Sequence, residues 1–291
     1  PASAEVQYPT DPRFDGKSWD DIALDFLAEH NIAPTSTDVC FGYCNLVTGE
    51  EHYYLGEQYM DAASMYKVAL NMIYADKIAN GEMGLDDSFY GVTFRYAQEM
   101  TIIHSDNEWA QNMWQNMAGN GKTGYRNMRE AMCYYMDEDI ETVDPLFWEN
   151  NYNNSRQIIN CLKKLWAGQD TVYRNVVDCM LQAERSNYFL RNPQKVDVAQ
   201  KYGYVENGAI YTNCCGICYT TEPIAIVMYT RSQFDPPAVL TDYCSLMIDY
   251  AEYKTLYDAA KAEEDAIQEA EQLAKQEQEK ERLAAEARER A

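Results

Sequence analysis

The segment from Ser64 to Asn80 restricts the fold more than any other part of this sequence. Its pattern predicts a helix that is apolar on all sides, and such a helix is normally buried at the centre of a domain. The pair Asn80-Gly81 is a typical helix end. Lys67 lies in the first turn of this helix, so we expect its side chain to be buried as well. The main apolar positions are Met65, Val68, Leu70, Met72, Ile73 and Ile78.

Helical and strand-like segments follow one another in an order that favours an α+β fold. We predict a three-layer α/β-α architecture with a mixed, mainly antiparallel sheet. The sheet draws strands from both ends of the chain, is flanked by terminal helices and carries an inserted all-helical subdomain. The expected segments besides the central helix are helix 19–30, strands 38–47 and 51–55, helical block 94–183, strands 196–202, 209–219 and 224–230, and helix 239–257.

Three regions follow from this pattern. Residues 1–17 form an extended lead-in, residues 18–257 form the main domain with a helical subdomain at about 64–195, and residues 258–291 form a charged helical tail. The tail is rich in Ala, Glu, Gln, Lys and Arg and shows no sustained heptad, which argues against a coiled coil. We expect it to add little to the stability of the main domain.

The composition excludes some classes of partner. The chain has 291 residues, 46% of them hydrophobic, which is enough for a substantial core. The formal net charge of −23 argues against binding to nucleic acid or to an anionic membrane, because both require basic residues. No run reaches the ~18 apolar residues of a membrane span. No signal peptide is present, and because the chain starts at Pro1 rather than Met, a removed leader stays open.

Nine cysteines are scattered along the sequence without the spacing of a zinc site. Two interpretations are open: buried free thiols that act as small apolar groups, or one or more disulfides if the protein is exported. We interpret His30, His52 and His104 as ordinary polar or capping residues. We therefore expect no metal and no other cofactor.

Ser64 and Lys67 form a Ser-x-x-Lys motif that suits nucleophilic catalysis. A serine hydroxyl needs a base beside it, and residues three apart share one face of a helix, so the amine can reach the hydroxyl. The helix N-terminus adds free N–H groups and positive potential at the same place. The motif therefore predicts Ser64 as the nucleophile and Lys67 as a base that works at least partly neutral.

Two further triplets offer complementary chemistry. In Ser105-Asp106-Asn107 the serine can relay a proton and the asparagine can hold a substrate amide, although this triplet is also an ordinary helix N-cap. In Lys201-Tyr202-Gly203, at the end of a predicted strand, the lysine can attract an anionic group and the glycine lets a substrate lie along the strand edge. An exposed strand lysine is the alternative interpretation of this second triplet.

The order of these motifs resembles that of the penicillin-recognising enzymes, whose signature is Ser-x-x-Lys, Ser-Asp-Asn and Lys-Thr-Gly. The segments from Ala62 to Asp87 and from Val198 to Ile217 resemble class A β-lactamases in particular. The resemblance covers roughly residues 20–255 and implies a β-lactamase/transpeptidase-like fold that acylates its nucleophilic serine. The site residues implied in this way are, as catalytic groups, Ser64, Lys67, Ser105 and the backbone of Tyr204, and, as substrate-binding groups, Asn107, Lys201, Tyr202 and Gly203.

The sequence also departs from this family. Tyr202 replaces the Thr or Ser whose small hydroxyl normally meets a substrate carboxylate. The family hydrolyses its acyl-enzyme with a glutamate in a Glu-x-x-Leu-Asn loop, and here only Glu141 is a weak candidate. The segment between Ser64 and Ser105 is shorter than in a typical β-lactamase. A literal Lys-Thr-Gly at residues 122–124 lies between two helical runs, so we interpret it as a loop.

These observations predict a β-lactamase-like serine hydrolase that acts on an amide or lactam through a Ser64 acyl-enzyme, with weak β-lactam turnover. Two alternatives stay open: a D-alanyl peptidase or transpeptidase of the cell wall, and a non-catalytic binding module on the same scaffold. The expected partner is a small-molecule or peptide substrate, and the expected state is a monomer. The resemblance implies an extracytoplasmic location, secreted or at the cell surface.

Overall fold

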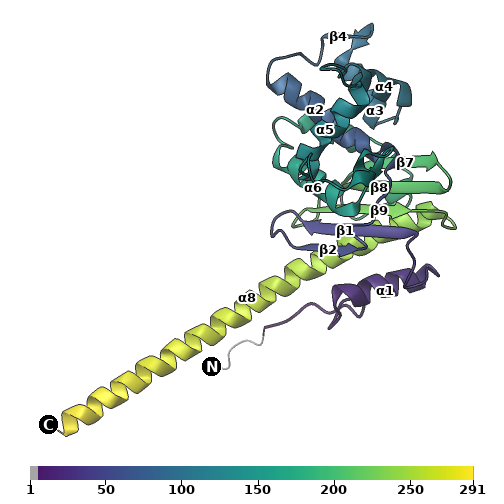
Figure 1. Ribbon diagram of the computed structural model, residues 1–291. Helices are drawn as coiled ribbons and strands as arrows, with labels where there is room; N and C mark the ends of the chain where they lie inside the picture. The colour runs from purple at the N-terminus through teal and green to yellow at the C-terminus, as the bar shows by residue number, and fades with distance from the viewer. Residues whose placement is uncertain (1–5, 291) are drawn as a thin grey trace.

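The computed structural model describes residues 6–290 and has a five-stranded antiparallel sheet at its centre (Figure 1). In sheet order the strands are β2 (Glu51–Tyr54), β1 (Val39–Asn45), β9 (Ile224–Thr230), β8 (Ile210–Cys218) and β7 (Val198–Glu206). Strands from the start of the chain therefore pair with strands from its end. Every neighbouring pair in this sheet is antiparallel.

Helices cover both faces of the sheet, as the three-layer prediction required. α1 (Trp19–Glu29) and α8 (Pro236–Glu289) lie on one face, and the helical subdomain lies on the other (Figure 1). Ser18 begins α1 through a capping box with Asp21. A sheet covered on both faces buries side chains that point either way, and all residues of β1 and β9 are buried accordingly.

The central helix of the sequence analysis is α2 (Lys67–Ala79), and its residues from Lys67 to Ala75 are all buried. The other helices of the subdomain each pack against it, which explains why it can be apolar all round. Two short two-stranded sheets complete this part. The helices are α3 (Phe94–Ile102), α4 (Asn107–Gln115), α5 (Gly124–Met136), α6 (Ser155–Ala167) and α7 (Arg174–Met180), and the short strands pair as β3 (Met60–Asp61) with β6 (Tyr152–Asn153) and β4 (Ser88–Phe89) with β5 (Val92–Thr93).

Element boundaries differ from the predicted ones at both motifs of the site. β7 continues past Tyr202 to Glu206, because its pairing with β8 runs on until Glu206 lies opposite Ile210. Lys201-Tyr202-Gly203 therefore lies inside a strand and not at its end. Ser64 lies in a 3-10 turn, Ala63–Tyr66, that leads directly into α2.

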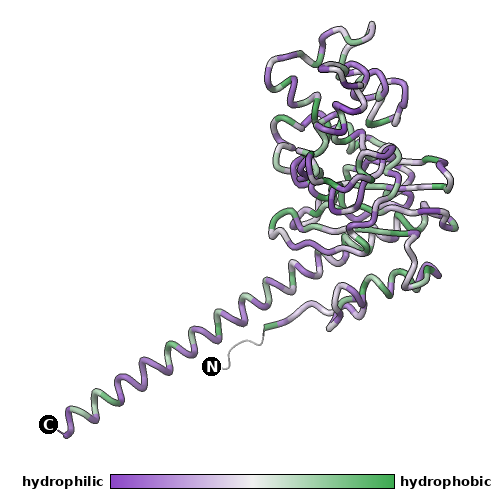
Figure 2. Tube along the Cα trace, in the orientation of Figure 1, coloured by the Kyte–Doolittle hydropathy of each residue, from purple (hydrophilic) through white to green (hydrophobic). Residues whose placement is uncertain are grey.

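α8 runs without a break from Pro236 to Glu289, so the predicted boundary between residues 257 and 258 lies within one helix. The last part of this helix is mostly hydrophilic (Figure 2). The lead-in nonetheless follows it: the rings of Tyr8 and Tyr257 lie 5.0 Å apart, and the Tyr8 hydroxyl donates to Glu264. Residues 1–5 of the predicted lead-in lie outside the described residues, and the division into domain and tail stays a prediction.

The cysteines are all buried and free, which fits their interpretation as small apolar groups. Within residues 6–290, no helix combines the length and the apolar character that crossing a bilayer requires. Over the same residues, no cluster of His, Cys, Asp and Glu side chains is arranged to hold a metal ion.

Truncation after Asp265 should leave the melting temperature within ~2 °C of that of the full chain, because the residues removed lie outside the core. Truncation after Tyr257 should give a lower melting temperature, since it also removes the buried Ala260 and the Glu264 partner of Tyr8. Scanning calorimetry of the two variants and the full chain checks this. Equal melting temperatures for both truncations would show that the lead-in gains nothing from lying on α8.

Candidate active site

The turn that carries Ser64 is held in a strained shape by polar contacts. Ala63 has a φ of 47°, in the left-handed region that residues with a side chain rarely adopt. Its N–H donates to Asp61 Oδ1 at 2.9 Å, and its carbonyl accepts from Asn151 Nδ2 at 2.5 Å. The carbonyl of Asn151 in turn accepts from the N–H of Ala62 at 2.9 Å. These contacts present the half-buried Ser64 at the N-terminal end of α2.

Lys67 begins α2, and its side chain is completely buried. Its Nζ donates to the carbonyl oxygens of Ser105 at 2.6 Å and Asp106 at 3.1 Å, and to Asn107 Oδ1 at 2.8 Å. Burial lowers the pKa of Lys67 to about 7, and the Asp106 carboxylate opposes this shift. An amine of this kind is partly neutral near pH 7, which is the condition that a general base requires.

The Ser105-Asp106-Asn107 triplet serves two purposes. Asp106 caps α4, because its Oδ1 accepts from the N–H of Trp109 at 2.9 Å. Ser105 adopts a φ of 55°, and its Oγ lies 3.4 Å from Lys67 Nζ and 2.8 Å from Lys201 Nζ. The triplet is therefore a helix cap, as one interpretation held, and it also places a hydroxyl between two buried lysines.

Lys201 and Gly203 lie on the part of β7 that passes the turn Ala63–Tyr66. We call this turn the nucleophile turn, after the role predicted for Ser64. Lys201 is completely buried, and its Nζ donates to Ser105 Oγ and to the Tyr202 carbonyl at 2.9 Å. Burial, and next the charge of Lys67, hold the pKa of Lys201 well below its usual range. A Cβ at Gly203 would lie 2.6 Å from the Ser64 nitrogen, so only glycine lets the strand pass this close to the nucleophile.

The side chain of Tyr202 makes its contacts with other parts of the protein. Its hydroxyl lies 3.2 Å from the Ile103 carbonyl and 3.3 Å from Glu184 Oε1. Its ring stacks on Tyr188 with centroids 4.5 Å apart, and Lys201 Nζ lies 3.9 Å from its centroid. The ring thus covers the lysine by a cation–π contact. The Tyr202 hydroxyl is therefore engaged within the protein. It is not free to bind a substrate carboxylate, as the small hydroxyl of a Thr or Ser would be.

Tyr204 contributes its backbone groups to the site, and its side chain takes no part in it. Its side chain is 53% exposed, and its hydroxyl donates to Glu206. β7 is an edge strand, and the Tyr202 carbonyl faces the open edge, where it accepts from Lys201. Residues two apart in an antiparallel strand direct their backbone groups the same way, so the N–H of Tyr204 also faces the open edge, near Ser64.

Comparison with known proteins assigns this arrangement to a family. The model of the beta-lactamase enzyme family matches residues 27–241, which is most of the chain. The chain belongs to the beta-lactamase enzyme family. No curated protein matches the sequence.

Solved β-lactamases share the fold of this β-lactamase family member. One from Chitinophaga pinensis DSM 2588 is 16% identical with a TM-score of 0.62, and the match covers 78% of this chain and 97% of that one. One from Xanthomonas campestris pv. campestris is 14% identical, with a TM-score of 0.64 and coverages of 79% and 97%. An ancestral class A β-lactamase is 15% identical, with a TM-score of 0.64 and coverages of 79% and 99%. At such identities the likeness shows the fold, and it confirms the predicted fold class.

The weak candidate Glu141 is exposed in this family member. Within the described part of the chain, no hydrogen bond or ion pair joins its carboxylate to another residue, and the one carboxylate that shifts the pKa of Lys67 is Asp106. The literal Lys-Thr-Gly starts α5, where Thr123 is the N-cap and Lys122 pairs with Glu130. It therefore lies away from the sheet, as expected.

Three residues that shape the site had no signal in the sequence. Asn151 holds the nucleophile turn, and its Oδ1 is buried without a hydrogen-bond partner among residues 6–290. Glu184 reaches the Tyr202 hydroxyl. Arg129 is 1% exposed and donates to the Phe147 carbonyl, so it ties the loop before Asn151 to α5. Each lies outside any recognisable motif, and a lone polar residue in a helix or a loop has no spacing that predicts a contact.

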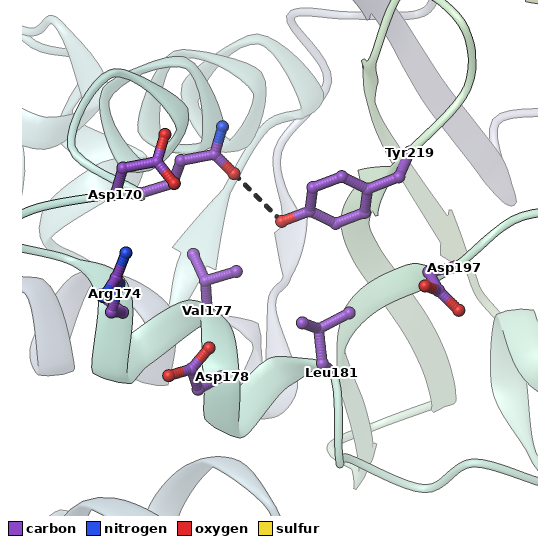
Figure 3. A pocket seen from close by; sticks show the side chains of 8 residues that line it. Asp170, Arg174, Val177, Asp178, Leu181, Asp197 and Tyr219 are labelled. Atoms are coloured by element: carbon purple, nitrogen blue, oxygen red, sulfur yellow. Dashed lines mark hydrogen bonds between the residues drawn. The ribbon is translucent and has the colours of Figure 1, made fainter.

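A separate hollow of about 470 Å³ lies where α7 faces the start of β7 (Figure 3). Asp170, Asp178 and Asp197 line it, and the Tyr219 hydroxyl donates to Gln169 at its wall. None of the residues that line this hollow is a serine, threonine or cysteine. This hollow shares no residue with the group formed by Ser64, Lys67, Ser105 and Lys201.

Gly203→Ala should lower the rate of acylation of Ser64 by about 10- to 100-fold, because the new methyl group displaces the nucleophile turn from the strand edge. The matched control is Gly119→Ala, where a Cβ meets nothing within 4 Å. The rate of labelling by a fluorophosphonate measures the effect, and calorimetry checks that both variants fold. Normal labelling of Gly203→Ala would show that the close approach of β7 is not needed.

The rate of acylation should rise about tenfold per pH unit below pH 7 and level off above it, since only the neutral amine of Lys67 accepts a proton. Lys67→Arg should lower the rate at least ~10²-fold, because a guanidinium stays charged. Lys122→Arg, an exposed lysine paired with Glu130, is the control and should behave like the unaltered protein. Near-normal acylation by Lys67→Arg would mean that the site needs a charge and not a base.

Proposed function

We propose that this protein is a serine hydrolase that acts on an amide or lactam through an acyl-enzyme on Ser64. The observation that carries the proposal is the burial of two lysines around the Ser105 hydroxyl, next to the nucleophile turn. Burying an amine costs folding free energy, and a scaffold that only binds could replace both lysines with apolar residues. Membership of the beta-lactamase enzyme family supports a β-lactamase-like hydrolase.

Acylation starts when Ser64 Oγ attacks the carbonyl carbon and its proton passes to neutral Lys67. A neutral amine keeps two N–H donors for the oxygens of residues 105–107 and has one lone pair to turn to Ser64. The proton then reaches the leaving nitrogen through Ser105, whose Oγ lies 3.4 Å from Lys67 Nζ. Lys201 donates to the same Oγ, which leaves the Ser105 O–H free to face the substrate. The C–N bond breaks, and the amine leaves.

The oxyanion formed during this attack is stabilised by the backbone N–H groups of Ser64 and Tyr204. Ser64 lies in the first turn of its helical segment, where N–H groups have no partner within the helix. Tyr204 lies on the open edge of β7. Donors of this kind contribute about 3–4 kcal/mol each in characterised hydrolases.

Hydrolysis of the acyl-enzyme should be slow. It requires a base that deprotonates water beside the ester, and Asp106, the one carboxylate that acts on Lys67, already caps α4. Asn151 has a spare acceptor near the nucleophile turn, but a neutral amide accepts hydrogen bonds and not protons. Losing a positioned base costs typically ~10²–10⁴-fold in rate. Weak β-lactam turnover follows from this arrangement.

The substrate in this proposal is a small molecule or a peptide. We place the enzyme outside the cytoplasm, as is typical of the family, and treat it as a monomer that works without a metal or another cofactor. A non-catalytic binding module is the second candidate. It is favoured by one observation, that Lys67 donates to residues 105–107 while Ser64 Oγ has no hydrogen bond within the described residues.

A fluorophosphonate should form a single adduct on Ser64, located by mass spectrometry, and Ser64→Ala should abolish it. A chromogenic cephalosporin should be hydrolysed slowly or not at all, because the sequence lacks the Glu-x-x-Leu-Asn motif that supplies the family's deacylating glutamate. Ser105→Ala is the matched control: it should slow labelling without moving the adduct.

An adduct on Ser105, or one that survives Ser64→Ala, would contradict the assignment of the nucleophile. No adduct with any reactive probe would favour the binding module. Efficient cephalosporin hydrolysis that Glu141→Gln abolishes would show that Glu141 is the deacylating base after all.

A further inference from the structure

A carboxylate lies at the outer side of Tyr202. Glu184 is exposed, and its Oε1 lies 3.3 Å from the Tyr202 hydroxyl. Tyr202 itself is only 7% exposed, and its ring covers Lys201. At this end of the site Glu184 therefore places a negative charge at the surface, and the Lys201 amine lies beneath an aromatic ring.

The turn that carries Glu184 is fixed to the sheet. Gln200 on β7 is fully buried, and its Nε2 donates to the carbonyl oxygens of Glu184 at 2.9 Å and Ala183 at 3.0 Å. Glu184 has a φ of 41°, a left-handed conformation that these contacts hold. Tyr188, at the end of the same turn, stacks on Tyr202. The carboxylate is thus placed by a rigid support and not by a mobile loop.

Neither site lysine is free to receive an anionic group. Lys67 and Lys201 are both 0% exposed, and their amines already donate to oxygens of the Ser105 turn and of Tyr202. Arg185, which follows Glu184 in the sequence, is exposed and forms no ion pair among residues 6–290. A substrate carboxylate that reached the outer side of Tyr202 would meet the Glu184 carboxylate, and the Coulomb energy between the two anions would oppose its approach.

A hollow beside the same turn is free of charge. It has a volume of about 540 Å³, and none of the residues that line it is charged. Tyr188 and Tyr204 line one side, and Ile210, Pro236 and Pro237 contribute apolar surface. Tyr204 follows Gly203 along the strand edge, and because side chains alternate along a strand, this hollow lies at the same edge of the sheet but on the face that α8 covers. It can seat an uncharged group of a substrate that lies along that edge.

We infer that Glu184 is a specificity-determining residue, which directs this site to neutral or cationic acyl donors and against donors that carry a carboxylate beside the scissile bond. The inference rests on the proposed acylation of Ser64 and names the class of its substrate. Glu184 repels the anion, and the uncharged hollow takes a neutral group. The chemistry at Ser64 is the same for all donors, so the selection acts on binding and approach.

Three phosphonofluoridates test this, identical except that the alkyl chain ends in a methyl, a carboxylate or a trimethylammonium group. In each reaction Ser64 Oγ forms a bond to phosphorus, fluoride leaves, and the hydroxyl proton passes to Lys67. The carboxylate probe should label Ser64 more slowly than the other two. Glu184→Gln should raise the ratio of carboxylate to methyl labelling rates about 3- to 10-fold. Salt should reduce the discrimination in the unaltered protein and not in Glu184→Gln.

Two control variants separate the local effect from others. Glu29→Gln removes one negative charge from α1 on the far side of the sheet and should leave the ratio unchanged. Arg185→Gln changes the neighbouring charge and should not raise the ratio. Equal labelling by all three probes, fastest labelling by the carboxylate probe, or an unchanged ratio in Glu184→Gln would overturn the inference while leaving the proposed function intact. Failure of every probe to label Ser64 would instead overturn the proposed function.

Discussion

The contact of two buried lysine amines with one serine hydroxyl is the constraint on which the rest of this structure depends. Lys67 comes from the helical subdomain, Lys201 from the sheet, and Ser105 lies between them. A buried amine is tolerated only where oxygen atoms surround it, so the backbone of residues 105 and 106 must turn its carbonyls inward. The left-handed Ser105 achieves this turn. The same interaction therefore joins the two halves of the domain and lowers the pKa values of both lysines.

The nucleophile turn depends on segments that are far away in the sequence. Asp61 and Asn151 hold the strained backbone of Ala63, and Gly203 gives it room against the strand edge. Asn151 in turn depends on a loop that Arg129 anchors through backbone carbonyls and through the ring of Phe147, 3.8 Å from its guanidinium. The buried arginine is thus satisfied by carbonyls and a π face and not by a carboxylate. The loop therefore supports the turn of Ser64 through neutral contacts.

Most of the fold could be predicted from the sequence, because the spacing of apolar residues along a helix or strand reflects which side chains are buried. The all-apolar segment of α2 and its end at Asn80-Gly81 each have a local physical cause. The extent of β7 beyond Tyr202 could not be predicted, since it is set by pairing with β8. For the site, the motifs indicated Ser64, Lys67, Ser105 and Lys201, which the structure brings together. Glu184 and Asn151 were missed, because their roles exist only through tertiary contacts.

The length of α8 changes how the molecule moves through solution. At 1.5 Å per residue its 54 residues extend about 80 Å, whereas a compact domain of roughly 240 residues has a radius of gyration of only ~18 Å. Such a rod adds frictional drag out of proportion to its mass. A single copy should therefore elute from a sizing column ahead of compact proteins of 33.5 kDa, and early elution alone is not a sign of self-association. Scattering profiles or sedimentation, which separate shape from mass, give the stoichiometry directly.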